Sequence, residues 1–136
     1  MGAFRFLEHT ADLRVECRAE SLADLLETAA LALYAVAFHR RRQGTNVERH
    51  IDLAADTREQ LLVRWLQELI FLMDVERFAA TVFDIGTANE TALAATLRGY
   101  QYEPADRAEE VKAATYHELE VKKDAEGYVA RLIFDL

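Results

Sequence analysis

Two amphipathic helices, each opened by an N-cap signal, constrain the fold of this 136-residue chain more than any other feature. Ser21 and Asp24 open the first pattern in a near capping box, and leucine and alanine then recur at helical spacing up to Ala37. Thr57 and Gln60 open the second pattern with a fuller capping box. The apolar positions expected on the two helices are Leu22, Leu25, Leu26, Ala29, Ala30, Leu33 and Ala37 in the first, and Leu61, Leu62, Trp65, Leu66, Leu69, Ile70 and Met73 in the second.

Short segments that alternate apolar and polar residues, the pattern of half-buried strands, fill much of the remaining chain. We expect one turn around Gly86 and Asn89, and a hairpin turn over residues 123–127, whose glycine supplies the unusual φ. That hairpin would return Asp135 to the start of the preceding strand, near Lys112. The expected strands are residues 4–7, 12–18, 47–53, 81–85, 92–102, 112–122 and 128–136.

This order of elements predicts an α+β fold, with two helices packed on one face of a mixed, mostly antiparallel sheet of about six or seven strands. The sequence shows no linker, repeat or low-complexity segment, and it contains a single proline. We therefore expect one domain over residues 1–136.

Charge and composition favour a soluble, cytoplasmic protein. The net charge of −8 leaves no electrostatic footprint for unaided nucleic-acid binding, but it suits the binding of cations or of a basic partner surface. No apolar run reaches membrane-spanning length, and the N-terminal residues lack a signal-peptide pattern. The single cysteine, Cys17, excludes an internal disulfide and a multi-cysteine zinc site.

Carboxylates at the two ends of the chain are the strongest functional lead. Asp135 follows an apolar strand as the penultimate residue, beside the terminal carboxylate of Leu136. Asp12 begins an early strand, and the two acids would meet if these strands were antiparallel neighbours. Three hard oxygen donors would then suit Ca²⁺, Mg²⁺ or Mn²⁺, with water completing the coordination. The alternative is that both are ordinary solvated acids at strand ends.

Several other polar residues allow both a structural and a functional interpretation. Lys112 is either a surface lysine or a group that holds the acids or contacts a phosphate. His9 could be a metal ligand, a group that orients a ligand, or a turn former. His117 lies on the apolar phase of its strand, which favours a hydrogen-bonded core histidine, and Cys17 is expected to be a small buried hydrophobe. The basic run at 40–42 either caps a helix or contacts RNA or an acidic partner.

Four motifs, in the right order, resemble the archease family. Residues 6–12 (FLEHTAD) resemble its N-terminal signature, and residues 65–71 (WLQELIF) its second-helix pattern. Residues 111–117 (VKAATYH) resemble its late-strand signature, and residues 134–136 (FDL) its C-terminal end. The resemblance extends from about Phe4 to Leu136.

This resemblance implies an accessory protein rather than an enzyme. Archeases activate an RtcB-type RNA ligase, which seals tRNA halves after intron removal and joins other broken RNAs. They promote guanylylation of the ligase histidine and repeated turnover, so RNA would be reached only through the ligase, without a membrane. The family's metal site, usually associated with calcium, corresponds here to Asp12, Asp135 and a main-chain oxygen of Leu136. Lys112 corresponds to a lysine implicated in activation, and His9 belongs to the first motif.

The sequence departs from the family pattern at two places. Glu8 stands where many members have aspartate, which makes it an additional candidate ligand, and residues 104–110 replace a His-Pro-x-Gly-type loop. Two other functions remain open. One is a metal-dependent phosphoesterase using Asp12 and Asp135, although the sequence shows no evident base or nucleophile. The other is a general chaperone or adaptor that binds partners through its helices.

Overall fold

The computed structural model describes residues 2–7, 12–39 and 43–136, which form two helices, seven strands and one short 3₁₀ turn. The first half of the chain contains β1 (Ala3–Leu7), β2 (Asp12–Ala19), α1 (Leu22–Ala37), β3 (Val47–Ala54) and α2 (Arg58–Glu76). The second half contains β4 (Phe78–Asn89), β5 (Ala92–Gln101), the 3₁₀ turn at Pro104–Asp106, β6 (Ala113–Asp124) and β7 (Gly127–Asp135).

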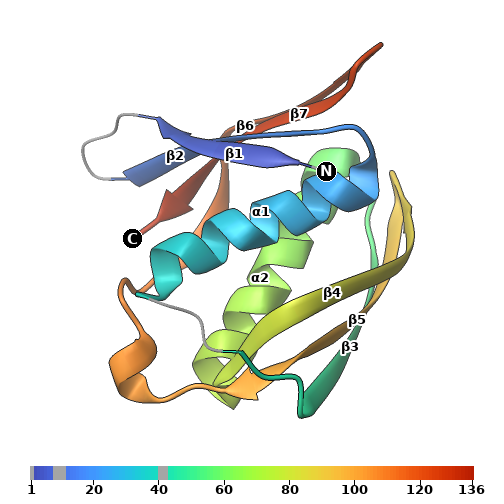
Figure 1. Cartoon of the computed structure of the whole chain (residues 1–136). Helices are drawn as coiled ribbons and strands as arrows, with labels where there is room; N and C mark the ends of the chain where they lie inside the picture. The colour runs from blue at the N-terminus through green and yellow to red at the C-terminus, as the bar shows by residue number, and fades with distance from the viewer. Residues whose placement is uncertain (1, 8–11, 40–42) are drawn as a thin grey trace.

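The strands form two separate antiparallel sheets, and the two helices lie between them (Figure 1). One sheet has the order β1-β2-β7-β6 and the other the order β3-β5-β4. The predicted α+β class, with two helices and seven strands, is therefore confirmed for the described residues. The single mixed sheet of the prediction is corrected to two sheets in which every described strand pair is antiparallel.

Both helices begin where their capping signals predict. The Ser21 hydroxyl accepts a hydrogen bond from the Asp24 amide at 3.1 Å, and the Thr57 hydroxyl accepts one from the Gln60 amide at 3.1 Å. The Gln60 side chain accepts from the amide of Asp56, one residue before the usual capping-box donor. All the apolar positions predicted on the two helices are buried.

The helices are buried around more of their circumference than a single stripe predicts. Thr28, Ala32, Tyr34 and Val36 of α1 are buried as well, because α1 contacts β1, β2 and β7 on one side and β4 on the other. The two helices also contact each other, and the Trp65 indole donates a hydrogen bond to the Leu26 carbonyl at 2.8 Å. The hydrophobic core thus fills the layer between the sheets.

The expected turn around Gly86 and Asn89 is only partly correct. Strand β4 continues through Gly86, where its register with β5 shifts between Ile85 and Thr87. The turn follows at residues 90–91, and the Asn89 side chain accepts a hydrogen bond from the Thr91 amide at 3.0 Å. Gly86 therefore belongs to a bulge, a position that also favours glycine.

The prediction of a buried His117 is wrong. Residues 116–119 are left out of the β6–β7 pairing, because Thr115 pairs with Ile133 and Glu120 already pairs with Arg131. Glu118 in this bulge has a φ of 56°, and the His117 side chain is 74% exposed. The extra residues interrupt the two-residue alternation on which the prediction depended.

The C-terminal hairpin turns as predicted. Asp124 pairs with Gly127, whose φ of 132° favours glycine, and a Cβ there would clash with the carbonyl oxygen of Ala19. This hairpin brings the beginning of β6 beside the end of β7. Within the described part of the chain, neither helix is long and apolar enough to cross a membrane.

Candidate functional site

The register between β2 and β7 places Asp12 directly opposite Asp135. Side chains at such paired positions project from the same face of a sheet, with Cβ atoms about 5 Å apart. Their neighbours Leu13 and Phe134 pack against the core, so the two acids lie on the outer face. Asp12 is half-buried and Asp135 is exposed. The structure therefore brings together the two carboxylates that the sequence singled out from opposite ends of the chain.

Lys112 lies next to the same corner. Ala113, the first residue of β6, pairs with Asp135, and the Lys112 amide donates a hydrogen bond to the Asp135 carbonyl at 2.8 Å. The Lys112 side chain is exposed. Gln67 of α2 supports this strand end, because its side-chain oxygen accepts a hydrogen bond from the Ala114 amide at 3.0 Å. The predicted proximity of Lys112 to Asp135 is thus found, whereas the role of Gln67 was missed.

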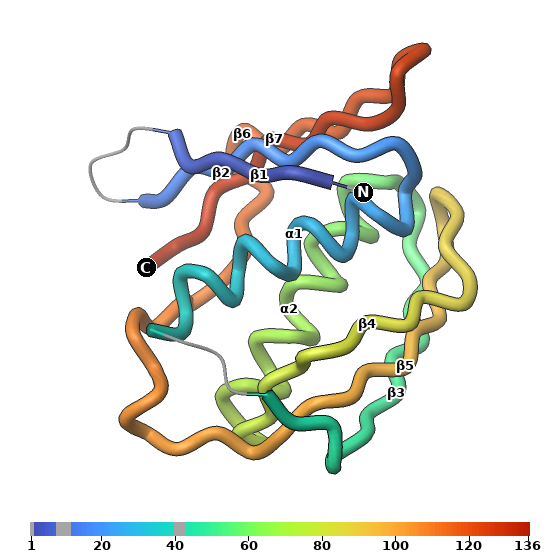
Figure 2. Tube along the Cα trace, in the orientation of Figure 1, coloured from blue at the N-terminus to red at the C-terminus, as the bar shows by residue number. Residues whose placement is uncertain are grey.

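Packing fixes the end of the chain at this corner. Phe134 is fully buried, and the half-buried Leu136 packs against the core. The main-chain carboxylate of Leu136 is one residue from Asp135. Figure 2 shows the end of the chain next to the beginning of β2. We call the region formed by Asp12, Lys112, Asp135 and Leu136 the acidic corner.

The donor set of the acidic corner fits a hard cation. Asp12 and Asp135 form no ion pair with any described residue, and two adjacent carboxylates without a cationic partner favour uptake of a proton or a metal. Oxygen donors are the ligands that Ca²⁺ and Mg²⁺ prefer. The described residues contain no group of three or more His, Cys, Asp or Glu side chains placed to hold a metal. A site here therefore needs the terminal carboxylate and water as well.

Two candidate residues of the first motif cannot be placed in this geometry. Glu8 and His9 fall in the segment 8–11, which is outside the described residues. The same applies to the basic run at 40–42. Their roles remain predictions from the sequence.

Arg107 is a positioning residue that the sequence analysis missed. Its Nε donates to the Ala37 carbonyl at the end of α1, and its Nη1 donates to the Asp74 carboxylate of α2, each at 3.1 Å. Its guanidinium also lies over the ring of Phe38, 5.4 Å from the centroid. Arg107 thereby ties the loop that leads to Lys112 to the ends of both helices.

The charge of Arg107 is stabilised in this setting. Burial alone would lower the pKa of its guanidinium, but hydrogen bonds with Tyr102 and Asp74 raise that pKa above its ordinary value. A lone arginine in an otherwise acidic loop, shortly after a tyrosine, is the only sequence signal that could have pointed to this contact.

Glu16 is a second residue whose environment the alternation did not reveal. It lies on the polar phase of β2, yet its side chain is only 2% exposed. It accepts hydrogen bonds from the Nε atoms of Arg5 and Arg18 at 3.2 Å each and of Arg131 at 3.0 Å. Burial alone would raise the pKa of the Glu16 carboxyl, but hydrogen bonds from these arginines lower it below its usual value. Glu16 is therefore ionised at neutral pH.

Cys17 has the structural role that the sequence predicted. It is fully buried, and burial, followed by the nearby Glu16 charge, raises the pKa of its thiol to about 12. The thiol is therefore protonated at neutral pH, so Cys17 acts as a small core residue.

These features define a class: a small α+β domain with a two-helix layer between antiparallel sheets and an acidic corner where both ends of the chain meet. The model of the archease protein family matches residues 4–136. The chain is 34% identical to Protein archease of Archaeoglobus fulgidus, covering 98% of each chain. It is 32% identical to Protein archease of Methanosarcina mazei, covering 98% of this chain and 95% of that one. The chain belongs to the archease family.

Solved structures agree with this assignment. The solution structure of a Methanobacterium thermoautotrophicum protein aligns with a TM-score of 0.76 and 28% identity, covering 98% of each chain. The crystal structure of an archease from Thermotoga maritima, described as a possible chaperone, aligns with a TM-score of 0.71 over 96% of this chain and 94% of that one. The identity to the second structure is 22%, so that likeness shows the fold alone.

Proposed function

We propose that this protein is a non-catalytic, metal-binding activator of an RtcB-type RNA ligase. In this proposal it promotes guanylylation of the ligase histidine and multiple turnover during tRNA splicing or RNA repair. Family membership supports the proposal, and the meeting of Asp12 with Asp135 carries it. RNA is reached through the ligase.

The acidic corner has the chemistry that this role needs. Asp12, Asp135 and the carboxylate of Leu136 would hold a divalent cation, with Ca²⁺ preferred and Mg²⁺ or Mn²⁺ as alternatives. When bound, such a cation supplies charge neutralisation and orientation for phosphate groups. Lys112, held by its main chain at Asp135, can donate to a phosphate oxygen of the partner complex. Gln67 and Arg107 keep Lys112 in position through the strand end and the preceding loop.

The decisive assay measures guanylylation of the matching ligase with this protein and each divalent ion. We expect Asp12→Asn, Asp135→Asn and Lys112→Ala to abolish stimulation while the domain stays folded by circular dichroism. Asp84→Asn is the matched control, because Asp84 is also an exposed strand aspartate but lies on β4 in the other sheet. Stimulation by folded Asp135→Asn equal to that of the unchanged protein would refute the proposal.

A C-terminal extension separates this role from that of a general chaperone or adaptor. A short peptide tag after Leu136 converts the terminal carboxylate into an amide and crowds the acidic corner. The proposed activator should then lose ligase stimulation, while an N-terminal tag should leave stimulation intact. An adaptor that works through its helices would tolerate both tags.

A further inference from the structure

The outer face of the four-stranded sheet carries an arginine cluster that the proposed function does not use. Arg5 of β1 and Arg131 of β7 are the direct cross-strand partners of Glu16 on β2, and Arg18 lies two residues further along β2. Residues at these positions project from the same face. Four charged side chains from three strands therefore meet around one buried carboxylate.

All three arginines bind Glu16 through Nε. Among the described residues, no further hydrogen bond or ion pair engages their terminal Nη groups. The arginine side chains remain 68%, 60% and 56% exposed for Arg5, Arg18 and Arg131 respectively. Glu16 thus fixes the root of each guanidinium, and the Nη forks can bind an oxyanion in bidentate fashion.

The cluster is positive although the chain as a whole is acidic. The ionised Glu16 offsets one of three arginine charges, which leaves a local excess of two positive charges. The net charge of the chain is −8. A concentrated positive patch on an acidic domain directs anions to one face rather than to the whole surface.

A hollow with an apolar floor lies beside the cluster. The β6 bulge reaches across the outer face, where Glu118 pairs with Arg14 of β2 at 2.5 Å, and Ile133 on the intervening strand is only 3% exposed. The same bulge exposes 56% of Tyr116. The hollow measures about 210 Å³, and its lining includes Leu7, Arg14, Glu118, Glu120, Arg131 and Ile133.

We propose that this outer face binds single-stranded RNA, with Arg5, Arg18 and Arg131 contacting phosphodiester groups of the backbone. This goes beyond the proposed function, in which RNA is reached only through the ligase. Guanidinium groups that track a backbone, next to aromatic or apolar surface for the bases, are the usual means of binding single strands without sequence preference. Tyr116 and the hollow supply that surface, which favours RNA over an acidic polypeptide.

The test uses fluorescence anisotropy of a labelled oligouridylate of about 12 nucleotides, within the usual site size for single strands. The full chain, without ligase, should bind it at low salt and lose affinity as salt rises. The Arg5→Gln, Arg18→Gln double variant should reduce the slope of log affinity against log salt by about two, since each lost phosphate contact reduces it by about one. Glu16 keeps Arg131 as a partner in this variant, and circular dichroism checks its fold.

Arg98→Gln is the matched control. Arg98 lies on β5 in the other sheet, is 59% exposed and also pairs with a glutamate through Nε. It should bind RNA as the unchanged protein does. Absence of salt-dependent RNA binding, or an equal loss in Arg98→Gln, would overturn the proposal.

Competitors identify the occupant. Inorganic phosphate should compete only weakly, because it offers one contact where a strand offers several. If phosphate shifts the arginine Nε resonances in NMR spectra but the oligouridylate does not, the cluster is a small-anion site and the RNA proposal fails. If poly-glutamate binds as tightly as RNA and depends on the same arginines, the occupant is an acidic polypeptide and the proposal fails. The assay contains no ligase, so each outcome is independent of the activator function.

Discussion

Glu16 lies on the outer face of its strand, where a charged residue is ordinarily solvated, yet three arginines withdraw its carboxylate from water. Charge-assisted hydrogen bonds offset the cost of burying the carboxylate. The arginines themselves remain more than half exposed, so they can be hydrated again when Glu16 is removed. The interaction therefore joins β1, β2 and β7 without the full penalty of a buried ion pair.

The lowered pKa of Glu16 makes part of the folding stability dependent on pH. Because the folded-state pKa lies below the unfolded value, this contribution is complete above the ordinary glutamate pKa of about 4.3 and is lost as pH falls through the folded-state pKa. Glu16→Gln should lower the free energy of unfolding at neutral pH by about 1–3 kcal/mol and flatten its acid dependence. Urea unfolding at neutral and acidic pH measures both effects.

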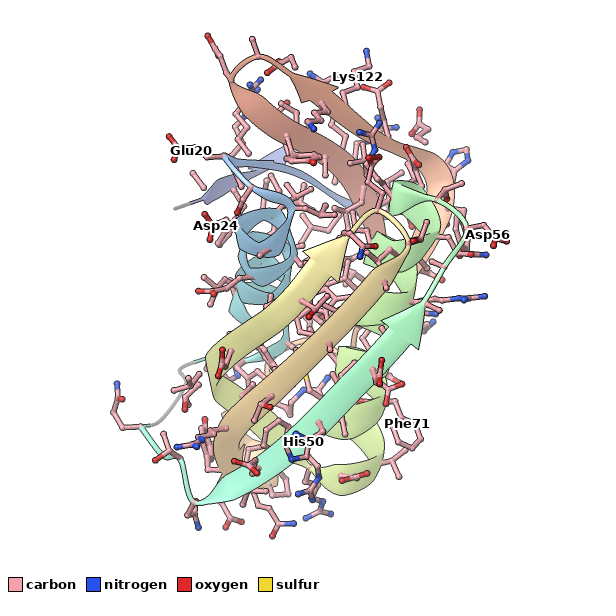
Figure 3. All side chains as sticks on the ribbon, turned by 90° about the vertical axis from the view of Figure 1, so that its right-hand side faces the viewer. Glu20, Asp24, His50, Asp56, Phe71 and Lys122 are labelled. Carbon is pink, nitrogen blue, oxygen red and sulfur yellow. The ribbon has the colours of Figure 1, made fainter. Side chains whose placement is uncertain are left out.

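Glu120→Gln is the control for this variant, since Glu120 is exposed on the neighbouring strand β6 and pairs with Lys122 at 3.5 Å. Lys122 projects from the far end of the hairpin (Figure 3). Glu120→Gln should change stability by less than about 0.5 kcal/mol. If Glu16→Gln and Glu120→Gln behave alike, the arginines do not stabilise the sheet through Glu16.

At the scale of elements, Arg107 connects the loop before β6 to both helices. Besides its contacts with Ala37 and Asp74, its Nη2 donates to the Glu109 carbonyl at 3.1 Å. The loop main chain contributes a further link, in which the Ala108 amide donates to the Ala37 carbonyl at 2.8 Å. The position of Lys112 therefore depends on a side chain five residues earlier in the chain.

Arg107→Ala should release this loop without unfolding the sheets. We expect faster amide hydrogen exchange at Ala108 and Lys112, little change in β4 and β5, and a loss of about 1–3 kcal/mol in the free energy of unfolding. Arg107→Lys should not restore protection, because a lysine cannot make the forked contacts. Unchanged exchange at Ala108 in Arg107→Ala would show that the main chain alone holds the loop.

The elements that the sequence predicts correctly are those with local signals. The N-caps at Ser21 and Thr57 depend only on residues within one turn, and both helices begin as expected. The glycine turn of the last hairpin fixes its register, which correctly places Asp135 near Lys112. The β6 bulge was missed because its shape depends on a long-range contact between Glu118 and Arg14, which alternation along one strand cannot reveal.

At the scale of the whole molecule, two sheets enclose the helices where one was expected. Figure 3 shows the β3-β5-β4 sheet covering the helices from one side, with the edge of α2 exposing Phe71. Phe71 is 48% exposed, so α2 is not buried on all sides. An apolar helix stripe shows that a face is buried, but not how many sheets cover it. The acidic corner was predictable because it needs only the antiparallel pairing of β2 and β7.

The most direct test of the central claim is isothermal titration calorimetry of the full chain with Ca²⁺. The acidic corner predicts one ion bound per chain, with affinity reduced at least about tenfold by Asp12→Asn and by Asp135→Asn, since ligand charge sets the affinity of such sites. Asp84→Asn should bind as the unchanged protein does. Equal Ca²⁺ affinity in all four proteins would contradict the claim that the two ends of the chain form a metal site.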